Sequence, residues 1–338
     1  MNTRDGSTSF LYSINGRPAS EPPLNTQRTP LSSGIVAVVT SFNPDESLLR
    51  VCGSVERQVE RVVIVDDGSS DGQSVLQLCR DRGWEVLKLE ENLGIAKALN
   101  VGIDAAITGN ERLTYVLTLD QDSWVPDRYV ESMLGCANQA RIDGIEVGLI
   151  APGKIDSNSM PRRHVRGKTV LGRNPIQSGL MIPLKTIHGV GAFTESLFID
   201  CVDTEYYIRC VESGRETVVC ETVVLGHRIG QVLVLEILGH KFRRNGRIFT
   251  VLFSAPFRYY YITRNRLLVT RQFGWRHKRW AFNGLTSDLK HILLLLLFVP
   301  GRARNMRFLM LGVLDGLRGR VGSIPHKFQL KAAKGCQA

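Results

Sequence analysis

Short apolar runs alternate with helix-like stretches along the chain from Gly34 onward. The runs predict strands at 34–40, 62–65, 84–89, 115–119 and 147–151. The first two do not alternate with polar residues, which is typical of strands buried on both faces. Between the strands we expect helices at 45–57, 72–82, 94–107 and 126–140, the last with Pro126 as its first helical residue. This alternation predicts a doubly wound α/β sheet, which binds ligands beyond the carboxyl ends of its strands.

The rest of the chain differs from this pattern at both ends. Residues 1–32 are rich in Ser, Thr, Asn and Pro without an apolar period, and we expect a flexible tail and no signal peptide. A catalytic domain is expected over 33–230, including a helix near 204–212. Residues 231–338 form a basic, leucine-rich and largely helical region. Its apolar run 291–299 has nine residues, short of the roughly 20 that span a bilayer, so we expect it to be buried or to lie in a membrane interface.

The charge is distributed unevenly. The chain has 43 Lys and Arg against 32 Asp and Glu, but from Gly226 onward there are 21 basic and three acidic residues, a net charge of +18. Residues 1–225 therefore carry 22 basic and 29 acidic residues, a net charge of −7. A basic end on an acidic body indicates a surface for a polyanion, either nucleic acid or anionic lipid.

The basic residues of this end flank apolar stretches that contain Trp275 and Trp280. They include Arg243, Arg244, Arg247, Arg276, Lys278, Arg279, Arg302, Arg304 and Arg307. No nucleic-acid-binding module is recognisable, whereas basic, aromatic and leucine-rich segments together favour an anionic membrane surface. We therefore expect a peripheral membrane protein that does not bind nucleic acid.

The seven cysteines are scattered and show no CxxC spacing. This argues against a zinc knuckle and against a disulfide framework, and it favours a reducing cytosol.

Two carboxylates, Asp120 and Asp122, follow the predicted strand 115–119 directly, separated only by Gln121. Carboxylates at a strand end can hold Mg²⁺ or Mn²⁺ against a diphosphate, and the cation then stabilises the departing nucleotide diphosphate. A DxD triplet is common by chance on solvated loops. Its position at the ligand-binding edge of the sheet favours a metal site.

Polar residues also follow the other predicted strands. Those expected to contact a nucleotide donor are Thr40, Phe42, Asn43, Asp67, Asn92, Gly94, Lys97, Asn100, Asp120 and Gln121. Asp67 is placed to accept the imide N–H of a uracil or thymine base, although Asp, Gly and Ser here also form ordinary turns and helix caps. The helix that begins near Gly94 presents backbone N–H groups to a diphosphate.

Three acidic residues, Asp200, Asp203 and Glu205, lie where a strand-like segment meets a helix. One of them can deprotonate an acceptor hydroxyl, a step that contributes about 10²–10⁴-fold, while the others cap the helix or bind the acceptor. Ser178 and Gly179 are expected to line the sugar pocket. His227 is either a ligand to the metal or diphosphate, or an ordinary loop histidine.

Together these motifs resemble family 2 glycosyltransferases, over about residues 34–320. The resemblance rests on LDQDS (119–123), the FIDCVDTEY segment (198–206), GHRIG (226–230), YYITRN (260–265) and DGLRGR (315–320), and within the family it is similar to bacterial rhamnosyltransferases. Asp66-Asp67-Gly68 departs from many of these, which have Asn after the first Asp.

The resemblance implies a GT-A nucleotide-sugar-binding fold with a mixed sheet and an inverting transfer in cell-envelope synthesis. Asp203 is then the base, and Asp120, Asp122 and His227 hold the metal. The donor is dTDP-L-rhamnose, with a UDP-linked sugar as the alternative, and the acceptor is a lipid-linked saccharide or glycolipid. A nucleotidyltransferase would instead have a glycine-rich loop after its first strand, where this chain has Thr40–Pro44. The intact acidic triplet disfavours a non-catalytic binding protein.

Overall fold

The computed structural model describes residues 33–227, 253–299 and 301–324, together with the backbone of short strands between 232 and 252. The chain forms two compact units. The sheet unit contains the described residues before Ser196 and those from Val202 to His227, and the helical unit contains the segment Ser196–Cys201 and the residues after His227. The tail expected at 1–32 lies outside the described residues.

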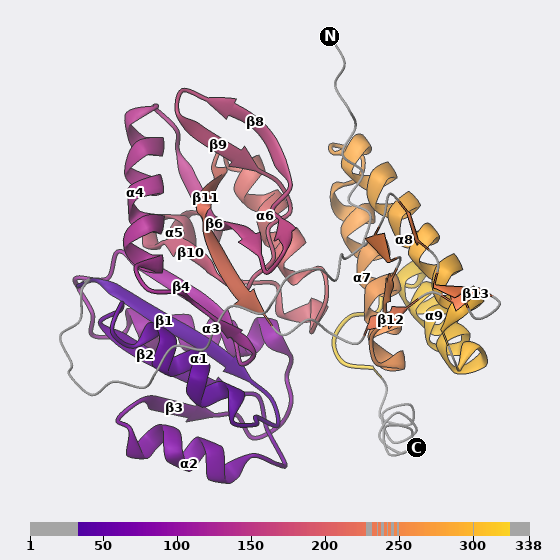
Figure 1. Ribbon diagram of the computed structural model, residues 1–338, viewed down its shortest axis with the longest axis horizontal. Coiled ribbons are helices and arrows are strands. Elements are labelled where there is room, and N and C mark those ends of the chain that lie inside the picture. Colours follow the sequence, from indigo (N-terminus) through magenta and orange to yellow (C-terminus); the bar gives the residue numbers. More distant parts are fainter. Residues whose placement is uncertain are drawn as a thin grey trace. The chain divides into compact units, whose positions relative to one another are not determined.

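A mixed sheet organises the sheet unit (Figure 1). Its strand order is β3-β2-β1-β4-β10-β6-β11-β9-β8, with β1 (Ile35–Ser41), β2 (Arg61–Asp66), β3 (Glu85–Lys88), β4 (Tyr115–Asp120), β6 (Val147–Ile155), β8 (Arg162–Arg166), β9 (Thr169–Gly172), β10 (Leu180–Pro183) and β11 (Glu216–His227). The short strands β5 (Ser123–Trp124) and β7 (Asn158–Ser159) pair with β11 and β6. The five predicted strands are β1 to β4 and β6, and β10 is antiparallel to β4 and β6.

Helices cover both faces of this sheet, as expected for a doubly wound fold. They are α1 (Ser47–Val55), α2 (Gln73–Asp81), α3 (Ile95–Ile107), α4 (Tyr129–Ile142), α5 (Leu184–Val190) and α6 (Val202–Glu212). Apolar residues of α1, α2 and α4 share one core cluster with alternate residues of β1, such as Ala37 and Val39. Gly102 of α3 packs against Val38 and Val65, whose side chains point to the other face.

Helix α4 begins later than the sequence pattern indicated. Its first residue is Tyr129, so the expectation that Pro126 opens the helix is wrong. The carbonyl of Pro126 accepts a hydrogen bond from Gln58 Nε2, and Arg128 adopts a left-handed conformation (φ 59°). The hydrogen bond from Gln58 and the left-handed conformation of Arg128 keep residues 126–128 out of the helix, which therefore starts at Tyr129.

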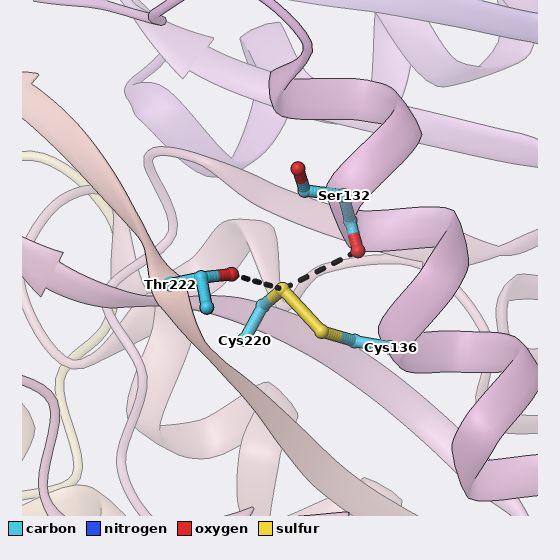
Figure 2. Close-up of a disulfide and its surroundings, with 4 residues drawn as sticks. All are labelled: Ser132, Cys136, Cys220 and Thr222. Carbon is cyan, nitrogen blue, oxygen red and sulfur yellow. Dashed lines mark hydrogen bonds between the residues drawn. A yellow bond between two sulfur atoms is a disulfide. The ribbon is translucent and has the colours of Figure 1, made fainter.

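One disulfide joins Cys136 of α4 to Cys220 of β11 (Figure 2). Figure 2 also shows Cys220 in contact with the Ser132 carbonyl and the Thr222 hydroxyl. The expectation that the cysteines form no disulfide is therefore wrong for this pair. The two are 84 residues apart in sequence, and only the packing of α4 against β11 brings them together. Among the described residues Cys52, Cys79, Cys201 and Cys210 are not disulfide-bonded.

Three helices dominate the helical unit: α7 (Pro256–Phe273), α8 (Lys278–Phe298) and α9 (Arg302–Leu317). Their core contains Tyr259, Tyr260 and Tyr261 together with Leu295 and Phe308. Before them, β12 (Val232–Val234), β13 (Glu236–Ile237), β14 (His240–Lys241), β15 (Arg243–Arg244), β16 (Arg247–Ile248) and β17 (Thr250–Leu252) pair as β12–β17, β13–β14 and β15–β16. The region is helical and basic, as predicted.

Helix α8 is longer than the nine-residue apolar run that marks it in the sequence. It has 21 residues, and among the described helices it is the one long and apolar enough to cross a membrane by length and composition. The core helix of a water-soluble protein can meet the same criterion, so the surroundings of α8 must decide its role.

The disulfide makes a measurable contribution to stability. Replacing Cys136 with Ser should lower the free energy of unfolding of the sheet unit by about 2–4 kcal/mol under oxidising conditions, because the bond restricts the unfolded chain. Thermal denaturation with and without dithiothreitol measures this, and Cys201→Ser, at a cysteine outside the disulfide, is the control. A Cys136→Ser protein as stable as the oxidised wild type would contradict the prediction.

Candidate active site

The parallel register of β1, β2 and β4 places the polar strand ends next to one another. Thr40 of β1 pairs with Asp120 of β4, and Ser41 pairs with Asp66 of β2. Strand β10 runs the opposite way and begins beside Thr118, so Ser178 and Gly179 reach the same edge. The segments singled out in the sequence thus converge on one edge of the sheet.

The side chain of Gln121 links the end of β4 to the loop after β1. It accepts a hydrogen bond from Phe42 N (2.8 Å) and donates one to Phe42 O (3.2 Å). Thr40 Oγ1 lies 3.4 Å from Asp120 Oδ1. The acidic triplet and the loop after β1 therefore form one hydrogen-bonded unit, in which Gln121 positions the backbone.

The structure brings Asp122 and His227 together from positions 105 residues apart. Asp122 Oδ1 lies 3.5 Å from His227 Nδ1, and Ser123 Oγ lies 2.7 Å from the same nitrogen. Pairing of β5 with β11 aligns His227 with Ser123, and Asp156 Oδ1 accepts the backbone N–H of His227 at 3.1 Å. The predicted proximity of this histidine to the acidic triplet is present in the structure.

Gly226 permits this strand pairing. It lies opposite Trp124, and a Cβ atom on Gly226 would fall 2.2 Å from the indole ring. The guanidinium of Arg50 lies 5.9 Å from the centre of the same ring. Only glycine therefore allows β11 to approach β5 closely enough to place His227 beside Asp122.

Asp67 is buried and holds the loop after β3. Its two carboxylate oxygens accept the backbone N–H groups of Leu93 (2.8 Å) and Gly94 (2.9 Å). Burial raises the pKa of the Asp67 carboxyl, while these two hydrogen bonds act in the opposite direction. Asp67 thus fixes the start of α3, and a base would bind to the remaining lone pairs of a carboxylate that is already held in place.

Three other residues expected to contact a donor have internal partners. Asn43 Oδ1 accepts the backbone N–H groups of Ser70 and Asp71, both at 3.1 Å. Lys97 forms an ion pair with Glu195 (3.3 Å). The buried amide of Asn100 donates to Phe193 O and Glu195 Oε1 and accepts from Phe193 N, each at 2.9 Å. A donor contact by Asn100 would have to replace these bonds.

Three of the buried polar atoms that have no hydrogen-bond partner among the described residues lie near this edge of the sheet. They are Ser41 Oγ, Asn92 Oδ1 and Gln177 Nε2, and the six others belong to Arg57, Asn174, Arg215, Glu216, Thr217 and Thr270. Ser178, by contrast, is used internally, because its hydroxyl accepts the backbone N–H of Asp120 at 3.0 Å. Gly179 adopts φ +78° and its carbonyl accepts the Tyr129 hydroxyl at 2.7 Å. Since buried polar groups are normally satisfied, the three orphaned atoms fit a site that receives a polar ligand.

The three candidate bases have three different surroundings. Glu205 is buried, 2% exposed, and both its oxygens bind Arg209 (2.8 and 2.9 Å). Asp200 pairs with Arg258 at 2.5 Å inside the helical unit. Asp203 is half-buried in the first turn of α6, where its Oδ1 accepts the backbone N–H of Thr204 at 2.7 Å. Guanidinium groups therefore hold Asp200 and Glu205, and Asp203 lies in the first turn of α6.

The segment before Asp203 is held by α7. Asn265 Nδ2 donates to the carbonyls of Leu197, Ile199 and Asp200 at 2.7–2.9 Å. The fully buried Arg264 donates to Leu197 O at 3.0 Å. This explains the pairing of Arg and Asn in the YYITRN motif, since both side chains satisfy backbone carbonyls of a loop with left-handed residues.

Several residues of this region carry no local signal in the sequence. Arg258 and Asp156 become relevant only through contacts 58 and 71 residues away. Ser123 and Trp124 follow the acidic triplet, but their pairing with β11 is a tertiary event.

The donor atoms near the triplet suit a divalent cation. Asp120 and Asp122 offer carboxylate oxygens, and His227 offers an imidazole nitrogen, a set that matches Mg²⁺ or Mn²⁺ completed by phosphate oxygens. Within the described residues, no three His, Cys, Asp or Glu side chains converge as a complete metal site.

Comparison with known proteins identifies this arrangement. Residues 36–194 match the family described as Glycosyl transferase family 2. The chain is also 27% identical over 311 residues to dTDP-rhamnosyl transferase RfbF of Shigella flexneri, covering 86% of this chain and 98% of that protein. Residues 36–194 of this chain carry a glycosyltransferase family 2 domain. Its activity is therefore glycosyl transfer, and the GT-A fold expected from the sequence is confirmed.

Other similarities are more distant. The glycosyltransferase resembles the S. aureus TarS 1–349 structure in complex with UDP-GlcNAc, at 13% identity and a TM-score of 0.45, covering 85% of this chain and 92% of that one. It also resembles GalNAc-T7 with UDP, GalNAc and Mn²⁺, at 14% identity and a TM-score of 0.47, covering 57% and 43%.

Gly226→Ala tests the strand pairing that places His227. The added methyl group should displace Trp124 and β5, and with them Asp122, so that cation-dependent nucleotide binding falls at least about tenfold, a change of about 1.4 kcal/mol. Calorimetric titration of nucleotide with and without Mn²⁺ measures this. Gly135→Ala, in α4 with no atom near its Cβ position, is the control and should bind normally. Unchanged binding by Gly226→Ala would show that the pairing is not needed.

Proposed function

We propose that this glycosyltransferase transfers L-rhamnose from dTDP-L-rhamnose, with inversion, to a hydroxyl of a lipid-linked saccharide or glycolipid in cell-envelope synthesis. The observation that carries the proposal is the similarity to dTDP-rhamnosyl transferase RfbF over 86% of this chain and 98% of that protein. The strand-end cluster of Asp67, Asp120 and Asp122 supports it, because its groups match a nucleoside diphosphate donor.

The donor would lie along the carboxyl ends of β1, β2 and β4. Thr40, Phe42 and Asp67 would surround the base, and the N-terminus of α3 at Gly94 would face the diphosphate. The orphaned atoms of Ser41, Asn92 and Gln177 are suitable partners for donor oxygens and N–H groups.

Asp120, Asp122 and His227 would hold Mg²⁺ or Mn²⁺ together with the diphosphate. The cation supplies charge stabilisation for the departing nucleotide diphosphate. Ser123 and Asp156 fix the orientation of His227 through the imidazole Nδ1 and the backbone N–H.

Asp203 would act as the general base. The acceptor hydroxyl gives its proton to the Asp203 carboxylate while its oxygen forms the new bond to the anomeric carbon. The bond from that carbon to the diphosphate breaks on the opposite face, and the electron pair leaves with the nucleotide diphosphate. The assignment rests on the FIDCVDTEY segment (198–206), in which Asp203 falls at the position of the base in the family motif.

We also propose that the protein is cytoplasmic and binds peripherally to the inner face of the cell membrane. A lipid-linked acceptor would be presented there, and the net charge of +18 after residue 225 would favour anionic headgroups.

A donor screen tests the donor and the metal together. We expect dTDP-L-rhamnose to be hydrolysed or transferred in preference to UDP-linked sugars, and Asp122→Ala to abolish transfer and the cation dependence of donor binding. Product formation across nucleotide sugars with Mn²⁺ and with excess EDTA measures this. Preference for a UDP-sugar would make the alternative donor correct, and near-wild-type turnover of Asp122→Ala in EDTA would refute the metal assignment.

Asp203→Asn tests the base. The amide keeps the shape but cannot accept a proton, so kcat should fall about 10²–10⁴-fold while donor affinity stays unchanged. Steady-state kinetics and donor titration measure the two quantities. Glu205→Gln and Asp200→Asn, each of which weakens an ion pair, serve as comparisons and should retain more activity. If Asp200→Asn is the less active variant, the base is Asp200.

A further inference from the structure

Large apolar side chains form an exposed stripe along α8. They recur every three or four residues, which places them on one face of the helix. The residues, with their exposed fractions, are Phe282 (67%), Leu285 (40%), Leu289 (58%), Leu293 (52%) and Leu297 (59%). A contiguous apolar surface of this kind on a soluble domain marks an interaction site.

The opposite face of α8 is packed within the helical unit. Ala281 and Leu295 are buried, and Asp288 forms an ion pair with Arg266 of α7 at 2.6 Å. The guanidinium of Arg266 also lies 5.3 Å from the centre of the Trp280 ring. These contacts fix the rotation of α8 about its axis, so the stripe is held away from α7.

Helix α9 and the residues after it carry a second stripe with the same spacing. Its exposed residues are Met306 (40%), Met310 (53%), Leu314 (44%), Leu317 (67%) and Val321 (56%). The buried residues Asn305, Phe308, Leu309 and Asp315 lie on the packed side of this helix. Both helices therefore combine a packed face with an apolar face that no described residue covers.

Exposed basic residues lie at the ends of these stripes. Arg276, Lys278 and Arg279 occur where α8 begins, next to Trp275, which is 82% exposed. Arg302, Arg304 and Arg307 occur where α9 begins, just after α8 ends. Between 253 and 324 there are 13 Lys and Arg and two acids, a net charge of +11. Both acids are engaged, Asp288 by Arg266 and Asp315 by Arg320.

The apolar stripes and the basic residues at their ends together indicate which kind of partner binds to this surface. A second copy of the helical unit would bring the same positive charges together, which opposes association. An anionic lipid surface instead offers acyl chains to the stripe and negative headgroups to the arginines and lysines. The Asp288–Arg266 pair lies midway along α8, where a helix that crossed the bilayer would place it in the hydrocarbon core, so we favour a helix in the plane of the interface.

We propose that the outer face of α8, extended by that of α9, is a lipid-binding surface that inserts into the interface of an anionic bilayer. The inference deepens the proposed peripheral membrane association and names the side chains responsible. It does not depend on the identity of the donor sugar. The side chains of Arg243, Arg244 and Arg247, which the sequence also indicated, lie outside the described residues.

The test uses the full-length protein and vesicles of phosphatidylcholine with and without phosphatidylglycerol. A triple variant, Leu289→Gln, Leu293→Gln and Leu297→Gln, should bind phosphatidylglycerol vesicles at least about tenfold more weakly than wild type, because apolar side chains drive insertion. The matched control replaces three exposed apolar residues of the sheet unit with Gln: Leu78 (48%), Ile142 (77%) and Val165 (61%). It should bind like wild type, and both variants should keep the wild-type melting temperature.

A second variant separates charge from apolar contact. Arg276→Gln, Lys278→Gln and Arg279→Gln together should weaken binding to phosphatidylglycerol vesicles at low salt. Salt should reduce wild-type binding without abolishing it, since the Debye length falls from about 10 Å at 0.1 M to about 3 Å at 1 M.

Four results would overturn the inference. They are no vesicle binding by the wild type, wild-type binding by the leucine triple variant, conversion of a dimer to a monomer by that variant, and salt-sensitive binding to duplex DNA in place of vesicles. Donor hydrolysis in solution is measured in parallel. If the wild-type protein does not hydrolyse the donor, the proposed glycosyl transfer is wrong. If it hydrolyses the donor but does not bind vesicles, only the lipid-binding surface is wrong.

Discussion

The parallel register of β1 with β2 and β4 is the constraint on which the site depends. It aligns Thr40 with Asp120 and Ser41 with Asp66. A slip of one residue would turn every side chain of β1 to the other face of the sheet and would move Thr40 and Ser41 out of line with Asp120 and Asp66. Because both faces of β1 are covered by helices, the register that buries the core is also the one that gathers the polar strand ends. Folding of the core and assembly of the donor site are therefore the same event.

A second, smaller pairing completes the site. Strand β11 reaches β5 through contact between Gly226 and Trp124, and this places His227 beside Asp122. Strand β11 is itself held by β6 over most of its length, and α4 is tied to it by the disulfide. The orientation of the His227 imidazole thus depends on Gly226, on the Trp124 ring and on the packing of β6 and α4 against β11. Substitutions far from the acidic triplet can therefore alter it.

The acids around residue 203 show how the environment separates chemically equal groups. Asp200 belongs to a segment bound by Asn265 and paired with Arg258, and Glu205 is buried against Arg209. Asp203, between them in sequence, starts a helix whose N-terminus favours its negative charge. Inside the helical unit, Arg264, Asn265 and Asp315 are likewise hydrogen-bonded to buried groups of that unit. Its outer faces are apolar with basic ends, and these two properties together make it suited to a charged lipid surface.

The sequence by itself determined the elements and their chemistry. The five strands, the turn residues after them, the acidic triplet and the basic helical end are all encoded within about ten residues, where side-chain period and turn preference act directly. Tertiary structure alone decided the partners. It showed that α4 starts after Arg128, that Cys136 meets Cys220, that Asn100 binds Phe193, and that Asp200 and Glu205 are paired with arginines. Each of these depends on a contact between residues many positions apart, and the energy of such a contact depends on packing that no local pattern of residue types records.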